Sequence, residues 1–332
     1  MYKKFHSNYI SVDYDKNKKP LFIGNFFKLN YGPSIKGFGM HYVNHDNNLH
    51  TPGREIIIEA KDSTNAIKAS KLILASLILI DSYMFINDKI PEIKPFLNNK
   101  EENDEIEFYK NGMKDFCRPG ILLACMIACK ASFRRKYYYA LFKYQLGCSL
   151  HSNTIVDLDP YHSPYYKLSP FIDDKIRMGN VITLFYSVIE ELGLEIRASK
   201  ENPSFIKKNW NPLVKNELEN RLKRSGIDIN DEYYWNLRST PTKIERYLRK
   251  QKKLSLLGKA QWAHGYTRDS KTKIVDAILL ISWMRARVAT HRLSKSNDLI
   301  NSISIYDVDN ANQLARWLLI EKLGFSKYFK KS

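Results

Sequence analysis

The chain has 332 residues, of which 44% are apolar, so it can bury a core and is not expected to be intrinsically disordered. Its formal net charge of +18 attracts polyanions, so a phosphate backbone or an acidic membrane surface is the first partner to consider. The alternative is a charge that serves only solubility.

The first sixty residues predict strands and turns. Residues 9–14 alternate, residues 21–31 are aromatic and run into Gly-Pro, and residues 55–59 form a short Ile-rich run. Beyond them the apolar residues recur at helical spacing. The sequence therefore predicts a mainly α protein with a small β-rich part over residues 1–60 and a helical domain over residues 61–332.

Helices are expected, in chain order, over about 62–85, 119–150, 173–192, 211–225, 274–291 and 307–323. Asp62, Ser63 and Thr64 can cap the first of these helices, and Pro119 suits the first turn of the second. Gly193, Gly226 and Gly324 follow helices as stop signals. Segments 98–115 and 157–169 are expected to be connections.

The cytoplasm is the expected compartment. Residues 1–14 lack an apolar run long enough for a secretion signal. The longest apolar stretch, residues 72–85, is interrupted by polar residues and is too short for a membrane span. The cysteines do not form a disulfide framework, and Cys125 and Cys129 are expected to be core thiols rather than half of a metal site.

A very basic region follows residue 237. Aromatic residues, among them Trp235 and Tyr247, lie within or just before it, and cations interleaved with aromatics suit a groove that binds unpaired RNA. The alternative is a solvated helix face. The cations expected to contact RNA are Arg238, Lys243, Arg246, Arg249, Lys250 and Lys253. A second cluster, residues 134–136, is expected to be helix surface over core tyrosines.

The helix expected over residues 274–291 carries the candidate chemistry. With about 100° of rotation per residue, Ile274, Ala277, Ile278, Ile281, Met284 and Val288 form its core-facing stripe. Arg285 falls inside this stripe, so its guanidinium must find a partner or line a cleft. His291 projects at the edge of the stripe, nearly in line with Arg287.

This helix end can support RNA cleavage without a metal or another cofactor. A neutral imidazole can take the proton of a 2′-hydroxyl, and a guanidinium can stabilise charge on the phosphoryl oxygens. In the alternative interpretation Arg285 forms a salt bridge to another helix and His291 is a polar helix end.

The run from Arg285 to His291, at the end of an amphipathic helix, resembles the Arg-x(4–6)-His signature of the HEPN superfamily, four-helix domains of prokaryotic toxins and defence ribonucleases. The resemblance implies a metal-independent endoribonuclease with Arg285 and His291 as the catalytic pair. It also implies a homodimer in which both copies contribute to one cleft. The chain has Ala286 where the family often has a polar residue, and Arg287 competes with Arg285 for the role of the arginine.

Other groups of polar residues give weaker indications of function. His264 can supply a second imidazole. His41, His45 and His50 are expected to lie in a surface loop, and Glu190 and Glu191 at a helix end are expected to be solvated. No phosphate-binding glycine loop and no acidic cluster of a two-metal nuclease occurs in the sequence.

The sequence thus predicts a HEPN-like endoribonuclease that acts as a toxin or antiviral effector, with Arg287 and Arg292 as supporting phosphate contacts. Its partners are RNA, a second copy of the chain and, to restrain a toxic activity, a regulatory protein; a membrane is not expected. A non-catalytic helical module that binds RNA or DNA is the alternative, and a scaffold is the third possibility.

Overall fold

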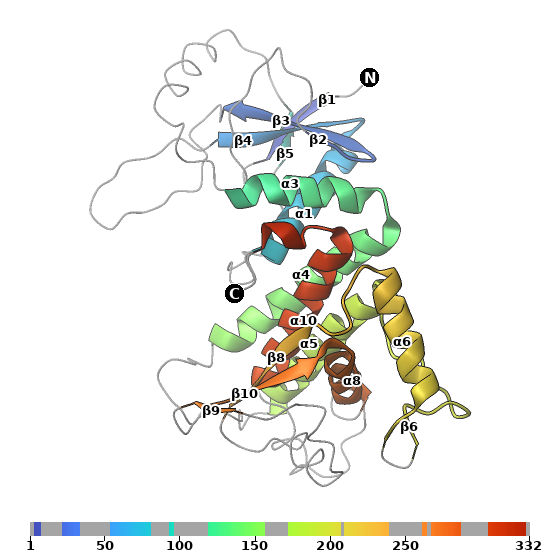
Figure 1. Ribbon diagram of the computed structural model, residues 1–332. Helices are drawn as coiled ribbons and strands as arrows, with labels where there is room; N and C mark the ends of the chain where they lie inside the picture. Colours follow the sequence, from blue (N-terminus) through green and yellow to red (C-terminus); the bar gives the residue numbers. More distant parts are fainter. Residues whose placement is uncertain are drawn as a thin grey trace. The chain divides into compact units, whose positions relative to one another are not determined.

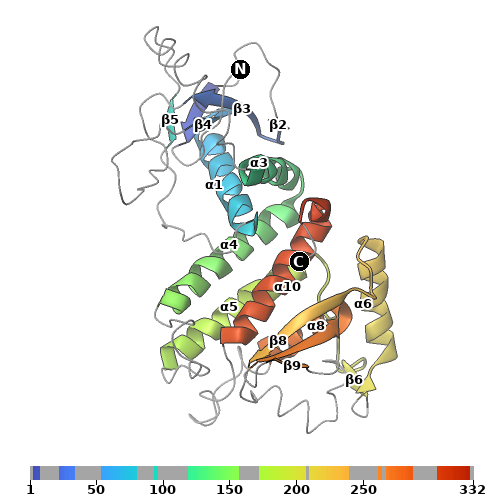
Figure 2. The same cartoon turned by 60° about the vertical axis from the view of Figure 1, so that its left-hand side comes forward.

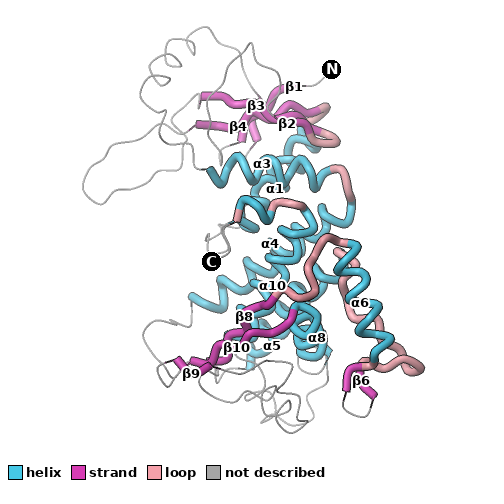
Figure 3. The backbone as a smooth tube through the Cα atoms, viewed as in Figure 1, coloured by secondary structure: helices cyan, strands magenta, loops and turns pink. Residues whose placement is uncertain are grey.

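The computed structural model describes residues 3–7, 22–33, 54–80, 93–95, 119–156, 172–206, 209–238, 261–263, 267–286 and 305–329. This part of the chain is mostly helical, with its strands in small antiparallel sheets (Figure 3), which confirms the mainly α expectation. The chain forms two compact units, Met1–Tyr138 and Tyr139–Ser332. The predicted division after residue 60 follows the change from strands to helices, whereas the first compact unit also includes the helices that pack on its strands.

The amino-terminal unit contains a five-stranded sheet with helices packed against it (Figures 1 and 2). The strands lie in the order β2-β3-β4-β1-β5 with antiparallel neighbours. Phe27, Leu29, Ile58 and Ala60 are fully buried, whereas the residues between them are partly exposed. This alternation is the pattern of strands with one face on the core. The strands are β1 (Lys3–Ser7), β2 (Phe22–Ile23), β3 (Phe27–Pro33), β4 (Arg54–Ala60) and β5 (Ile93–Pro95).

The predicted strands are confirmed in two places. Strand β4 covers the Ile-rich run, and the aromatic segment 21–31 forms the hairpin of β2 and β3 rather than one strand. A tight turn makes the hairpin, with the Gly24 amide donating to the Phe27 carbonyl over 2.9 Å. A Cβ atom at Gly24 would lie 2.7 Å from the Phe27 ring, so the turn needs glycine there. Segment 9–14 lies outside the described residues.

Helix α1 (Ser63–Ile80) begins where predicted. Asp62 caps it by accepting from the Asn65 amide over 2.8 Å. Helix α1 packs against α3 (Pro119–Ser132) and β4. Among the described residues it alone is long and apolar enough to cross a membrane, and half of its 18 residues are buried. Burial of this kind is also what the core helix of a folded domain shows.

The single helix predicted over residues 119–150 is wrong: the structure has two helices, α3 and α4 (Arg135–Val156). The break follows Ser132, whose hydroxyl donates to the Cys129 carbonyl and accepts from the Asn25 amide of the β2–β3 hairpin. The amides of Phe133 and Arg134 then bond three residues back, as in a tightened helix end. The sequence has neither glycine nor proline at this break, so no local stop signal indicates that the first helix ends there.

The core of the carboxy-terminal unit lies where α4, α5 (Ile172–Glu191) and α10 (Ile305–Leu323) meet (Figure 2). Tyr144 of α4 is fully buried, packs on the ring of Phe185 from α5, and donates to Asn312 Oδ1 of α10 over 2.7 Å. Helices α5 and α10 end at glycines with positive φ, 72° at Gly193 and 73° at Gly324, as predicted.

Two further α-helices belong to this unit. Helix α6 (Pro212–Arg224) begins at its predicted cap, because the Asn211 side chain accepts from the Leu213 amide over 3.1 Å. Helix α8 (Ile274–Met284) carries the candidate chemistry. A short 3-10 helix, Ser326–Tyr328, follows α10.

The helical domain predicted over residues 61–332 also contains strands that the sequence did not predict: a sheet of order β8-β10-β9 packs on α10 and α8. Its strands are β8 (Glu232–Arg238), β9 (Gln261–Ala263) and β10 (Thr267–Lys273), and a separate hairpin joins β6 (Phe205–Ile206) to β7 (Asn209–Trp210). The central strand β10 has the polar sequence TRDSKTK, which lacks the apolar alternation that predicts a strand.

Candidate functional site

Helix α8 holds Arg285 at its carboxy-terminal end. The helix is apolar on nearly all sides and buried, and the Ile274 amide at its start donates to the Asp231 carbonyl over 3.2 Å. Asp276 in its first turn accepts from Trp210 Nε1 over 2.8 Å. Burial raises the pKa of Asp276, and the Trp210 hydrogen bond opposes that rise. The predicted core-facing residues are buried up to Met284, but Val275, Asp276, Leu279 and Leu280 outside the stripe are buried as well, and Val288 lies outside the described residues.

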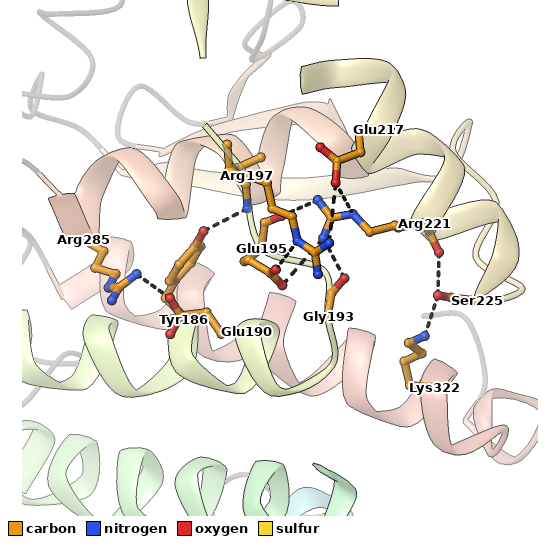
Figure 4. Close-up of polar contacts among 11 residues, drawn as sticks. Tyr186, Glu190, Gly193, Glu195, Arg197, Glu217, Arg221, Ser225, Arg285 and Lys322 are labelled. Carbon is orange, nitrogen blue, oxygen red and sulfur yellow. Dashed lines mark hydrogen bonds and ion pairs between the residues drawn. The ribbon is translucent and has the colours of Figure 1, made fainter. Parts of the chain in front are cut away.

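Arg285 has the partner that its position in the stripe requires. Its Nη1 donates to Glu190 Oε1 of α5 over 2.6 Å, and its guanidinium carbon lies 4.9 Å from the centre of the Tyr186 ring (Figure 4). The Arg285 side chain is 36% exposed and that of Glu190 34%, so the pair lies at the margin of the core. The salt bridge to another helix, considered as an alternative, is therefore present.

Tyr186 links this ion pair to the chain that follows α5. Its hydroxyl accepts from the Ile196 amide over 3.1 Å, because the turn at Gly193 directs residues 194–197 back along the helix (Figure 4). Burial raises the pKa of Tyr186, and hydrogen bonds with Ser282 and the Ile196 backbone oppose the rise. The phenol therefore stays neutral and offers Arg285 an uncharged aromatic face.

Arg221 of α6 holds that returning segment in place. It donates through its two terminal nitrogens to the carbonyls of Gly193 and Glu195, each over 2.7 Å, and its side chain is only 13% exposed (Figure 4). The carboxylates of Glu195 and Glu217 lie 3.6 and 3.5 Å from the guanidinium. Burial lowers the pKa of Arg221, and the Glu195 carboxylate opposes this change. The Arg221 side chain thus holds the segment from Gly193 to Glu195, which leads directly to the Ile196 amide that binds Tyr186.

The residues that surround Arg285 were not predicted from the sequence. Glu190 and Glu191 were expected to be solvated, but Glu190 binds Arg285 and Glu191 binds Lys143 of α4 over 2.7 Å. Tyr186 and Glu190 are four residues apart and so share one face of α5, but the spacing does not indicate that α8 lies beside that face. Nothing in the sequence indicates the role of Arg221, because its hydrogen bonds go to backbone carbonyls far away in the sequence, and its pairing with Glu217 is an ordinary contact along one helix face.

The structure does not describe the other residues that were predicted to act in catalysis. His291, Arg287 and Arg292 lie outside the described residues. Arg238 is the last residue of β8, where its backbone is paired with Thr267 of β10. The remaining members of the predicted RNA path also lie outside the described part of the chain, namely Lys243, Arg246, Arg249, Lys250 and Lys253.

The described cysteines are core thiols, as expected. Cys125, Cys129 and Cys148 are buried, and burial raises their pKa, to about 12 for Cys129 and Cys148. Thiols that remain protonated at neutral pH are poor metal ligands and poor nucleophiles. Within the described residues no group of His, Cys, Asp and Glu side chains is arranged to hold a metal ion.

Comparison with known proteins yields no relative: no family model, no curated protein and no solved structure matches the chain.

Proposed function

We propose that this protein is a metal-independent endoribonuclease whose carboxy-terminal helices form a HEPN-like bundle. The observation that carries the proposal is the position of Arg285: a half-exposed, oriented guanidinium at the end of α8, six residues before His291. The net charge of +18 supports RNA as the substrate.

In the proposed reaction, His291 takes the proton of a 2′-hydroxyl while that oxygen attacks the adjacent phosphorus. The bond from phosphorus to the 5′-oxygen breaks, leaving a 2′,3′-cyclic phosphate, and the departing oxygen takes up a proton. Arg285 stabilises the charge on the phosphoryl oxygens, and Arg287 and Arg292 contact neighbouring phosphates. The path for the remaining RNA runs along Arg238 to Lys253.

The ion pair with Glu190 is compatible with this role. A half-exposed salt bridge contributes only about 0–1 kcal/mol to stability, so a phosphate can compete with Glu190 for the guanidinium at little cost. A guanidinium has five N–H donors, more than one carboxylate can fill. Glu190 and Tyr186 then keep Arg285 oriented before RNA arrives, which reduces the ordering needed on binding.

The proposed biological role is that of a toxin or antiviral effector in the cytoplasm. A homodimer is proposed because one copy supplies one His291, and acid–base chemistry on both sides of the phosphate is easier with two. An activity toxic to its own cell also calls for restraint, for which a regulatory partner protein is proposed.

A non-catalytic RNA- or DNA-binding module is the second candidate. The contacts of Arg285 with Glu190 and Tyr186 favour it, because an arginine that only joins α8 to α5 would make the same contacts. The two candidates agree on binding and differ on cleavage.

The deciding experiment incubates end-labelled single-stranded RNA with the purified protein in EDTA. The parent is expected to cleave and to leave 2′,3′-cyclic ends, and His291→Ala is expected to bind RNA without cleaving it. His45→Ala is the matched control, since it removes an imidazole that is expected to lie in a surface loop and should leave cleavage intact. Arg285→Lys and Arg287→Lys, compared side by side, identify the functional arginine.

Each outcome separates the candidates. Intact RNA that the parent nevertheless retards on a gel supports the binding module and rejects the ribonuclease. Cleavage that survives in His291→Ala rejects the proposed catalytic pair. Neither cleavage nor retardation rejects both candidates and leaves a scaffold.

A further inference from the structure

The turn between α3 and α4, residues 130–136, presents cations around an exposed aromatic ring. The side chains of Lys130, Phe133, Arg134 and Arg135 are all exposed, and that of Phe133 is 58% exposed. The sequence predicts a basic helix surface over core tyrosines here. Tyr137 is buried as expected, whereas Tyr139 is 41% exposed, and the exposed Phe133 ring lies among the cations of the turn.

The stretch of sequence that contains this turn carries charge of one sign. From residue 119 to residue 156 the chain contains no Asp or Glu, while it carries Lys130, Arg134, Arg135, Lys136 and Lys143. Helix α4 has no acidic residue in its first turn, so the cations there add to the positive end of the helix dipole instead of offsetting it. A bound polyanion would relieve this accumulation of positive charge.

Two cations of the turn lie near the ring of the buried Tyr137. The guanidinium carbon of Arg134 lies 6.0 Å and the ammonium of Lys136 lies 5.0 Å from the centre of the Tyr137 ring. Ser132 ties the turn to the β2–β3 hairpin through the Asn25 amide, over 2.8 Å. A surface organised before its partner arrives loses less conformational entropy on binding.

We propose that this turn is a binding surface for single-stranded RNA, in which Arg134 and Arg135 contact phosphates and an unpaired base stacks on Phe133. An exposed ring can stack only on an unpaired base, so a duplex is a poor partner. One ring in the turn is enough to stack a base but is little apolar area for a membrane anchor. The inference rests on the proposed function for its choice of RNA, but it involves none of the residues around Arg285.

The test measures binding to a 2′-O-methyl oligouridine of about 20 nucleotides as a function of salt. This probe has no free 2′-hydroxyl, so binding is measured without cleavage. The double variant Arg134→Gln/Arg135→Gln is expected to lower the salt slope by about 1.4, the share of two single-strand phosphates. Phe133→Ala is expected to weaken binding by about tenfold.

The control double variant, Lys223→Gln/Arg224→Gln, removes the same charge from two exposed neighbours on α6 and should retain the parent's slope. An equal loss in both double variants overturns the proposal, because net charge alone would then explain binding. Unchanged binding in the Arg134/Arg135 and Phe133 variants also overturns it. So does a parent that binds phosphatidylserine vesicles through this turn but does not bind the RNA.

Phe133→Trp tests the stacking contact without removing the ring, so a loss of folding cannot be mistaken for a loss of binding. The new tryptophan adds fluorescence to the parent's emission, and RNA is expected to quench this added part. An indole that RNA does not quench overturns the stacking contact. Cleavage of ordinary RNA is assayed separately. A parent that cleaves nothing but loses binding in the turn variants refutes the ribonuclease and supports this surface.

Discussion

Glu190 on α5 accepts a 2.6 Å hydrogen bond from Arg285, the residue that follows α8, and so joins the candidate catalytic arginine to a neighbouring helix. The carboxylate both orients the guanidinium and competes with phosphate for it. These two effects act on different kinetic constants, which makes the pair testable.

Glu190→Gln is expected to lower KM about threefold, because phosphate no longer competes with a carboxylate, and to lower kcat, because Arg285 is less firmly oriented. The matched control is Glu191→Gln, which affects the neighbouring pair with Lys143 and should change neither constant. Kinetics on a single-stranded RNA substrate give both constants. Identical behaviour of the two variants would show that Glu190 has no special relation to the site.

Arg221→Lys is expected to destabilise the protein by about 2–3 kcal/mol. A lysine cannot reach the Gly193 and Glu195 carbonyls together, so a carbonyl loses its donor and the Glu195 carboxylate loses part of its compensation. Urea unfolding at neutral pH measures the change in the free energy of unfolding. Arg197→Lys, at a side chain that is 55% exposed, should change it little, and a similar loss in both variants would contradict the buried role of Arg221.

The sequence predicted those parts of the fold that depend on local signals. Helices α5, α6 and α10 end near residues with cap or stop chemistry, and the apolar faces of α1 and α8 follow helical spacing. What it missed depends on contacts between distant residues. The break after Ser132 is tied to a hairpin 107 residues away, and β10 is a strand because β8 pairs with it.

Only part of the candidate site could likewise be predicted from the sequence. The position of Arg285 at the end of a helix, and its need for a partner, followed from periodicity. The identity of that partner did not, because nothing in the sequence around Glu190 indicates that α5 lies beside α8. Arg221 is harder still to find, since it binds backbone carbonyls, and these are present at every residue.

Gly147→Ala is expected to destabilise the protein by about 1–3 kcal/mol, although alanine favours a helix interior over glycine by about 1 kcal/mol. A Cβ atom at Gly147 would lie 2.7 Å from the Phe185 ring, which is fully buried in the core. Thermal unfolding decides the sign. Adding Phe185→Leu should recover part of the loss, and a more stable Gly147→Ala single variant would show that α4 and α5 are not packed this closely.

His151 of α4 makes the stability of the fold depend on pH. Its side chain is 6% exposed, its Nδ1 has no hydrogen-bond partner among the described residues, and burial lowers its pKa from 6.5 to about 4. Above pH 6.5 the imidazole is neutral in both the folded and the unfolded chain. As the pH falls from 6.5 towards 4, only the unfolded chain gains the proton, so the stability falls, by roughly 3 kcal/mol in total.

The measurement is urea unfolding at several pH values between 7 and 4 for the parent and for His151→Gln, whose side chain stays neutral throughout. The glutamine variant is expected to lose less stability over this range, and the difference between the two curves isolates His151 from the carboxylates that titrate nearby. Below the folded pKa both states carry the proton, so the two curves should become parallel. Curves that are parallel over the whole range would mean that the imidazole accepts its proton in the folded chain as readily as in the unfolded one.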